Sequence, residues 1–127
     1  LKNRKNIKQV GIIDFQDAII GSPAYDIASL VQDVRRPIST KLENKLKEYY
    51  ALITNINPQE LDLDISFFSI QRNLKILGIF SRLKYRDKKE SYMKYIENAW
   101  GFINFHMEKP EFIYLKEWVD FHLKEKW

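Results

Sequence analysis

Asp14 stands at the end of a short apolar run, Val10-Gly11-Ile12-Ile13, and polar residues follow it. If the run is a β-strand, it fixes the Asp14 carboxylate at one point, where a following loop can bring other ligands. Magnesium prefers one or two carboxylates together with phosphate oxygens and water. Enzymes that transfer phosphoryl groups hold their metal with such an aspartate. Asp14 is also suited to a turn that caps the next segment, and spacing alone favours this interpretation over a metal ligand.

The elements that must position this carboxylate are mostly helices. Residues 7–14 predict one strand, and apolar periodicity predicts five helices. The helices are expected at residues 24–34, from a cap at Ser39 to about 54, from 62 or 64 to 85, at 91–107, and from Pro110 to 123. One strand cannot form a sheet alone, so its partners must come from the first six residues, another chain or absent sequence. The predicted fold is mainly α, with one short strand or hairpin at the N-terminus.

Two apolar stripes at helical spacing predict which helix faces are buried. The first comprises Leu42, Leu46, Tyr49, Tyr50 and Ile53, and the second comprises Phe67, Phe68, Leu74, Leu77, Phe80 and Leu83. Because the second stripe is the longer, we expect its helix to lie at the centre of the core.

The histidines and tryptophans are expected to be structural. His106 and His122 lie on separate predicted helices and have no second ligand four residues away, so metal binding is not expected of them. Trp100, Trp118 and Trp127 fall at helical or terminal positions, where core packing is expected rather than stacking on a sugar ring.

Composition limits the class of protein. The 127 residues suffice for one domain with a core, and 45% hydrophobic with 30% charged residues is ordinary for a globular chain. A net charge of +4 favours solvated helix faces over nucleic-acid binding. The chain has no apolar run of the roughly 20 residues that a membrane span needs. It has no cysteine, which excludes disulfides and fits a reducing compartment such as the cytoplasm.

The motifs around Asp14 resemble the aminoglycoside phosphotransferase and choline kinase superfamily, which has a protein-kinase-like fold. The resemblance lies in Ile13-Asp14-Phe15-Gln16-Asp17-Ala18 and in Gly21-Ser22-Pro23-Ala24-Tyr25-Asp26-Ile27-Ala28. Gln16 stands where protein kinases have a glycine. The stretch from Gln71 to Phe80, followed by Arg82, is similar to bacterial members that phosphorylate the anomeric hydroxyl of N-acetylmuramate and N-acetylglucosamine.

This resemblance implies roles for six residues. Asp14 would bind Mg²⁺ on the phosphates of ATP, and Asp26 would organise the lobe by bonding the backbone of the catalytic loop, unless it only caps a helix. Asp17 would approach the metal or the acceptor, or be a solvated turn carboxylate. Gln71, Arg72 and Asn73 would contact the substrate, where a guanidinium suits planar anions. An interhelical salt bridge or solvent exposure is the alternative for Arg72.

Part of the family pattern is missing from this chain. The family's catalytic loop, His-Gly-Asp followed by Asn, should precede the metal aspartate, but the thirteen residues before Asp14 do not contain it. The nucleotide-binding N-terminal lobe is also absent, and the chain begins with Leu. We therefore expect residues 1–127 to be one domain, the C-terminal lobe of a kinase-like phosphotransferase, and to be inactive alone.

The expected parent reaction transfers the γ-phosphoryl group of ATP to a hydroxyl of a small molecule, most simply a sugar. The expected partners are this acceptor and the missing N-terminal lobe, with neither nucleic acid nor a membrane. The alternative is a non-catalytic helical interaction domain that keeps the lobe's fold without its chemistry.

Overall fold

The computed structural model describes residues 20–123. The predicted strand, with Asp14 and Asp17, lies outside these residues, as does Trp127. Five α-helices and two short 3₁₀ helices make up the regular structure of the described part, which confirms a mainly α fold. They are α1 (Ala24–Val31), α2 (Thr40–Thr54), α3 (Pro58–Tyr85), η2 (Glu90–Tyr95), α4 (Ile96–Met107), η3 (Pro110–Phe112) and α5 (Ile113–His122).

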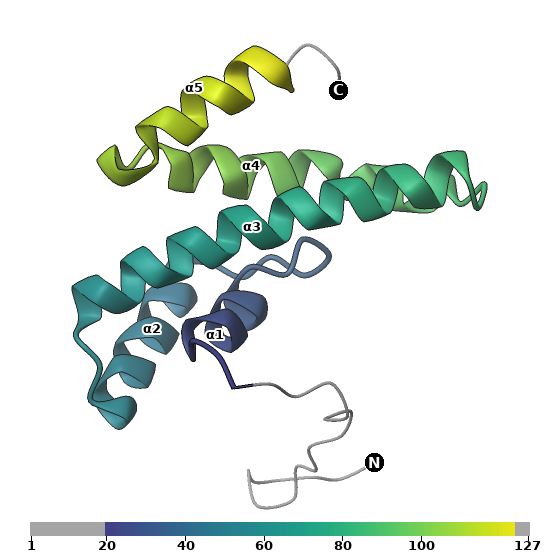
Figure 1. The fold of residues 1–127 in the computed structure, drawn as a ribbon. Coiled ribbons are helices and arrows are strands. Elements are labelled where there is room, and N and C mark those ends of the chain that lie inside the picture. The colour runs from purple at the N-terminus through teal and green to yellow at the C-terminus, as the bar shows by residue number, and fades with distance from the viewer. Residues whose placement is uncertain (1–19, 124–127) are drawn as a thin grey trace, which may run out of the picture.

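Helix α3 is the central element of the structure (Figure 1). The short helices α1 and α2 pack against its N-terminal half, and α4 runs back along it and carries α5 on the opposite side from α1 and α2 (Figure 1). This arrangement confirms the prediction that the longest helix lies at the centre of the core. Within residues 20–123, no helix is both long and apolar enough to cross a bilayer.

Helix α3 begins four residues before the earlier of its two predicted starts. Asn57 is its N-cap, and its side-chain oxygen accepts hydrogen bonds from the backbone N–H groups of Gln59 at 2.8 Å and Glu60 at 3.3 Å. Pro58 occupies the first helical position, where a missing N–H costs nothing. The pair Asn57-Pro58 therefore starts the helix, whereas the sequence interpretation treated it as a break.

Other helix ends also differ from the prediction. Helix α1 ends at Val31 rather than at residue 34, because Gln32 leaves the helical conformation (φ −124°, ψ 44°). Residues 91–95 form 3₁₀ rather than α structure, and η3 precedes α5. The predicted cap of α2 is confirmed, since the Ser39 hydroxyl accepts a hydrogen bond from the Leu42 N–H at 3.3 Å.

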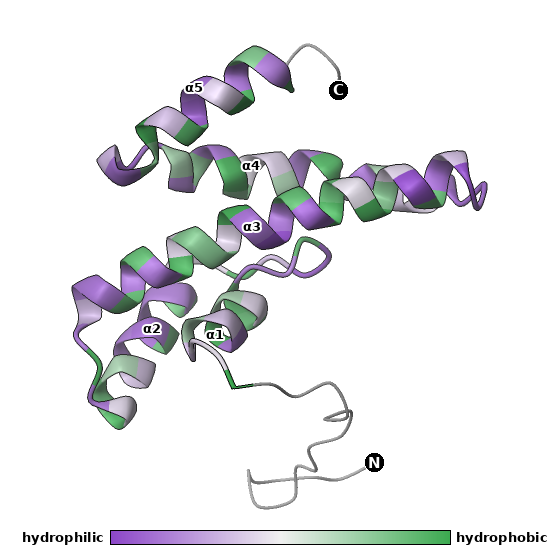
Figure 2. Ribbon diagram, viewed as in Figure 1, coloured by the Kyte–Doolittle hydropathy of each residue, from purple (hydrophilic) through white to green (hydrophobic). Residues whose placement is uncertain are grey.

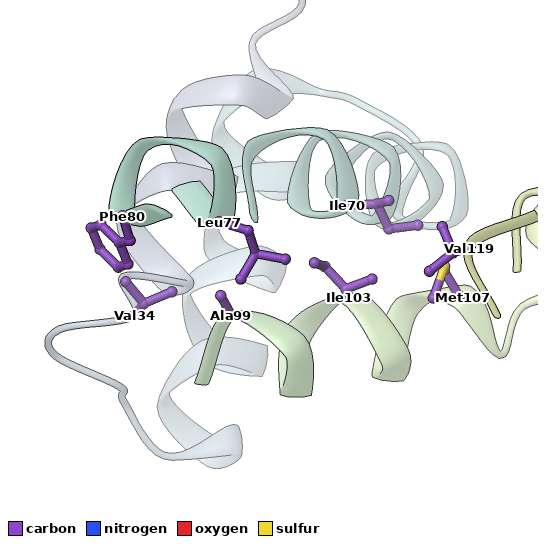
Figure 3. Packing of buried hydrophobic residues seen from close by; sticks show 8 residues of the cluster. All are labelled: Val34, Ile70, Leu77, Phe80, Ala99, Ile103, Met107 and Val119. Carbon is purple, nitrogen blue, oxygen red and sulfur yellow. The ribbon is translucent and has the colours of Figure 1, made fainter. Parts of the chain in front are cut away.

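The larger of two hydrophobic clusters fills the space between α3, α4 and α5. Figure 3 shows side chains from α3 and α4 facing one another, with Val119 of α5 and Val34 of the loop after α1 beside them. Its buried members are Val34, Ile70, Leu77, Phe80, Ala99, Ile103, Met107 and Val119. Hydrophobic and hydrophilic segments alternate along these helices, so each buries one face and leaves the other to solvent (Figure 2).

The smaller cluster joins α1 and α2 to the start of α3, and it corrects the stripe predicted for α2. Leu46 and Tyr50 pack against it, but Leu42, Tyr49 and Ile53 are exposed. Among the described helices, α2 contacts only α1 and α3, so it buries a narrow strip. Two further predictions of burial fail for side chains that face away from these contacts. Phe67 is 55% exposed and Trp118 is 54% exposed, whereas Trp100 packs against the larger cluster.

Candidate functional site

The face at the start of α1 holds the described residues closest in sequence to Asp14. The loop that enters α1 is tied down on two sides. The Ser22 hydroxyl donates to Asp64 of α3 at 3.3 Å, and the Tyr50 hydroxyl of α2 donates to the Pro23 carbonyl at 3.4 Å. Helices α2 and α3 therefore fix the position at which the chain enters α1.

Tyr25 and Arg72 contact each other on this face. The Arg72 guanidinium carbon lies 5.3 Å from the centre of the Tyr25 ring, a cation–π arrangement. The Phe68 ring meets the same ring edge-on, with 5.6 Å between centroids. This contact is neither the interhelical salt bridge nor the full solvent exposure that was the alternative for Arg72. The side chain is half-buried and pairs with an aromatic ring. The contact leaves the edge of the guanidinium available as a hydrogen-bond donor.

Asp26 lies one residue further along, in the first turn of α1, and is exposed. A carboxylate in this position is favoured by the partial positive charge at a helix N-terminus. It is not the N-cap, which is Pro23, and no hydrogen bond or ion pair joins its carboxylate to another residue of 20–123. Asp26 is thus available to a partner that approaches the start of α1.

Gln71, Arg72 and Asn73 do not gather at one place, because consecutive residues point about 100° apart around a helix. Gln71 is exposed, Arg72 covers Tyr25, and Asn73 is buried at 1% exposure. The Asn73 amide donates to the Ser69 carbonyl at 2.9 Å, and its own carbonyl oxygen is buried without a hydrogen-bond partner. Of these three, only Arg72 contacts a residue at the start of α1, namely Tyr25.

A buried hydrogen-bond network lies between the two hydrophobic clusters. It joins the end of α1 to α3 and α4 through five polar side chains that are each at most 3% exposed: Gln32, Ser66, Ser69, Asn73 and His106. His106 Nδ1 lies 3.0 Å from the Ser66 hydroxyl, and its Nε2 lies 2.5 Å from the Gln32 amide nitrogen. Ser69 donates to the Gln32 carbonyl oxygen. Buried polar groups of this kind are costly unless they are paired.

The neighbours of Gln32 determine the protonation of His106. The Gln32 amide nitrogen also donates to a Glu43 carboxylate oxygen at 3.3 Å, which fixes the orientation of the amide group. The amide therefore donates to His106 Nε2, and Nδ1–H donates to Ser66, so the imidazole is neutral. Burial, reinforced by the positive charges of Lys47 and Lys109, lowers the pKa of His106 to about 4.

Asp62 links the network to two lysines. It forms ion pairs with Lys47 of α2 at 3.3 Å and with Lys109 after α4, whose ammonium also donates to the Asp62 backbone carbonyl at 3.3 Å. Burial alone would raise the pKa of Asp62, but the hydrogen bond from Lys109 and the two ammonium charges hold it below its ordinary value. These pairs fasten α2, α3 and the end of α4 together.

The sequence interpretation missed this network, although a signal for it is present. Ser66, Ser69 and Asn73 recur at helical spacing on the face of α3 that also carries Ile70 and Leu77. Small polar residues on an otherwise apolar face predict a buried polar layer. Their partners Gln32 and His106 come from distant parts of the sequence, so only the fold identifies them.

The described residues do not supply a metal centre by themselves. Across residues 20–123, no three His, Asp or Glu side chains gather closely enough to hold an ion. The carboxylate predicted to bind Mg²⁺, Asp14, lies outside these residues.

The described part of the chain is a helical unit. Asp26 of α1 presents an exposed carboxylate, and Arg72 of α3 presents a guanidinium that is held against Tyr25. Comparison with known proteins gives the family. Residues 3–63 match the model of the phosphotransferase enzyme family. The predicted resemblance to this family is thereby confirmed.

Curated relatives are similar to the chain over most of its length. An N-acetylmuramate/N-acetylglucosamine kinase of Caulobacter vibrioides is 32% identical over 121 residues, which is 94% of this chain and 33% of that protein. Kinases of the same name from Pseudomonas putida and from Neisseria meningitidis serogroup B are 30% and 35% identical over 74% and 65% of the chain. The chain spans about a third of the length of these relatives.

Proposed function

We propose that this chain serves an ATP-dependent phosphotransferase that transfers the γ-phosphoryl group to a sugar hydroxyl, with an amino sugar as the acceptor. The observation that carries the proposal is the match to N-acetylmuramate/N-acetylglucosamine kinases over 94% of the chain. That match extends past the family motif into the helices that pack on α3. In this proposal residues 1–127 are the C-terminal lobe, the catalytic loop just upstream supplies the base, and an N-terminal lobe supplies most of the nucleotide contacts.

The proposal assigns a task to four of the candidate site residues. Asp14 would hold Mg²⁺ on the phosphates of ATP, and a metal there would neutralise charge that develops during transfer. Asp17 would approach the metal or the acceptor. Asp26, exposed in the first turn of α1, would accept hydrogen bonds from the catalytic loop. Arg72, held against Tyr25, would bind an oxygen of the acceptor.

The decisive experiment uses the parent protein, comprising this chain with its upstream sequence. ATP consumption is measured with N-acetylglucosamine and Mg²⁺ for the parent protein, for Asp14→Asn, and for Asp87→Asn as a control. Asp87 lies in the connector after α3, where it pairs with Arg86, far along the chain from Asp14. We expect Asp14→Asn to reduce kcat by about 100-fold or more and Asp87→Asn to leave it unchanged. Full activity of Asp14→Asn would contradict the assignment.

Assays of the isolated chain test whether catalysis requires the upstream sequence. It is expected to give no turnover with ATP, Mg²⁺ and N-acetylglucosamine, because the catalytic base would lie upstream. Robust turnover would show that the chain is not merely the C-terminal lobe of an enzyme. An inactive parent protein that binds neither Mg²⁺ nor ATP would instead favour a non-catalytic helical interaction domain.

A further inference from the structure

A cleft of about 400 Å³ lies between α2, α4 and the loop that joins α1 to α2. It is at the opposite end of α1 from Asp26. Its polar lining consists of seven side chains: Gln32, Thr40, Glu43, Asn44, Lys47, Glu97 and Asn98. The rings of Phe102 and Phe105 and the bare backbone of Gly101 form its α4 side. Small-molecule sites have this size, and the polar share of this lining favours a ligand rich in hydrogen-bonding groups.

The charges in the cleft are already paired, which limits the chemistry of its ligand. The Lys47 ammonium lies 2.8 Å from Glu43 and 3.3 Å from Asp62, so it is not free to attract an anion. Glu43 holds this lysine and also accepts from Gln32, so its carboxylate is not free to attract a cation. Glu97 is a carboxylate on the exposed rim. The interior thus offers hydrogen-bond donors and acceptors without a net charge of either sign.

The walls of the cleft are held in place before any ligand arrives. Gln32 is fixed by His106, Ser69 and Glu43. On the other side, the Asn98 amide donates to the Val34 carbonyl at 2.8 Å, which joins α4 to the loop. A rigid wall of this kind lowers the entropic cost of binding a small molecule.

Gly101 has no packing explanation within the described structure. A glycine inside a helix is destabilising relative to alanine. No atom outside its own helix lies within 4 Å of a Cβ built on Gly101, so close packing does not require the missing side chain. Without a side chain at Gly101, the backbone of α4 is directly accessible from the cleft. Gly78 of α3 shares the same freedom but does not line the cleft, so it serves as a control.

We propose that this cleft binds a neutral polyhydroxylated compound of monosaccharide size. Each hydroxyl both donates and accepts, which matches the mixed polar lining, and the apolar face of a pyranose ring suits the exposed ring of Phe105. Gly101 permits the ring to approach the helix. This inference does not depend on phosphotransferase activity, because it concerns binding to the isolated chain.

The test titrates the ¹⁵N-labelled chain with methyl β-D-glucopyranoside and follows amide chemical shifts, in the absence of ATP. This probe has no free anomeric hydroxyl, so it reports binding alone. Gly101→Leu places a side chain in the cleft, and Gly78→Leu makes the same change in an exposed part of α3. We expect saturable shifts at Asn98, Gly101 and Phe105, unchanged affinity for Gly78→Leu, and at least about tenfold weaker binding for Gly101→Leu.

A second variant and two charged probes complete the test. Phe105→Ala removes a ring that is 67% exposed, so it should fold normally and still weaken binding. Glucose 6-phosphate and glucosamine, as anionic and cationic probes, should bind no better than the neutral glycoside. The proposal is overturned if shifts do not saturate, if Gly101→Leu and Phe105→Ala bind as well as the unchanged chain, or if a charged probe binds more tightly. Shifts confined to Tyr25 and Arg72 would also overturn it, because the sugar would then bind on the α1 face.

Discussion

At the scale of single residues, His106 shows how burial sets chemistry. Its imidazole is 1% exposed, and both ring nitrogens have partners that require the neutral form. Protonation would place a second N–H against the Gln32 amide, beside Lys47 and Lys109, with only Glu43 and Asp62 to compensate. The folded state therefore resists protonation at pH values where an exposed histidine accepts a proton.

This resistance makes stability depend on pH. The pKa of His106 falls from 6.5 to about 4, so the unfolded chain binds more protons than the folded chain between these values. The contribution of neutral, buried His106 to the free energy of unfolding is fully present above pH 6.5, and it is lost as the pH falls towards 4. We expect the free energy of unfolding to decrease by on the order of 3 kcal/mol across this window. Urea denaturation at several pH values measures it.

His122 supplies the matched control, because it is exposed near the end of α5. His122→Gln should keep the slope of stability against pH, whereas His106→Gln should remove most of it. Asp62 contributes mainly below this window, because its pKa lies under 3.8. Equal slopes for the two variants would mean that His106 does not control the effect.

Arg72 is the residue at which packing and proposed chemistry can be separated. Its cation–π contact with Tyr25 accounts for only about 0.5–1 kcal/mol of stability, so Arg72→Ala should fold. If it binds the acceptor in the parent enzyme, the KM for N-acetylglucosamine should rise several-fold while the KM for ATP stays constant. Arg82→Ala, an exposed arginine later on α3, should change neither value. An unchanged KM for the sugar would remove Arg72 from the acceptor site.

At the scale of elements, the start of α3 depends on one side chain. The Asn57 oxygen satisfies the N–H groups of both Gln59 and Glu60, which the helix itself cannot do. Asn57→Ala should lower the free energy of unfolding by about 1 kcal/mol. Asn104→Ala, an exposed change within α4, serves as the control in chemical denaturation and should have little effect. Equal losses in the two variants would argue against the cap.

At the scale of the whole molecule, stability depends on the layer between α3, α4 and α5. Ile103 is fully buried at its centre (Figure 3), so Ile103→Ala removes contacts and leaves a cavity. We expect a loss of about 2–5 kcal/mol in the free energy of unfolding, measured by thermal or urea denaturation. Phe121→Ala on α5 removes a larger side chain that is 82% exposed, and it should cost much less. A comparable loss at Phe121 would mean that α5 packs differently.

The sequence predicted the helical class, the central helix and the α2 cap, because these follow from periodicity and from local side-chain chemistry. Its errors lie where a local signal has two meanings. Asn57-Pro58 serves equally as a break and as a helix start, and only the packing of Leu61 and Ile65 decides for the helix. The exposure of Phe67 and Trp118 likewise depends on which helices pack against them, not on their residue types.

The family and the candidate metal ligand came from the sequence alone, because the motif from Ile13 to Ala28 is a continuous stretch whose residue types and order suffice to identify it. The tertiary structure decided what distant residues do together. It placed Arg72 against Tyr25, separated Asn73 from Gln71, and joined Gln32, Ser69 and His106 in one buried network. Such contacts depend on how helices pack, because each brings together side chains separated by tens of residues, and no local pattern specifies that distance.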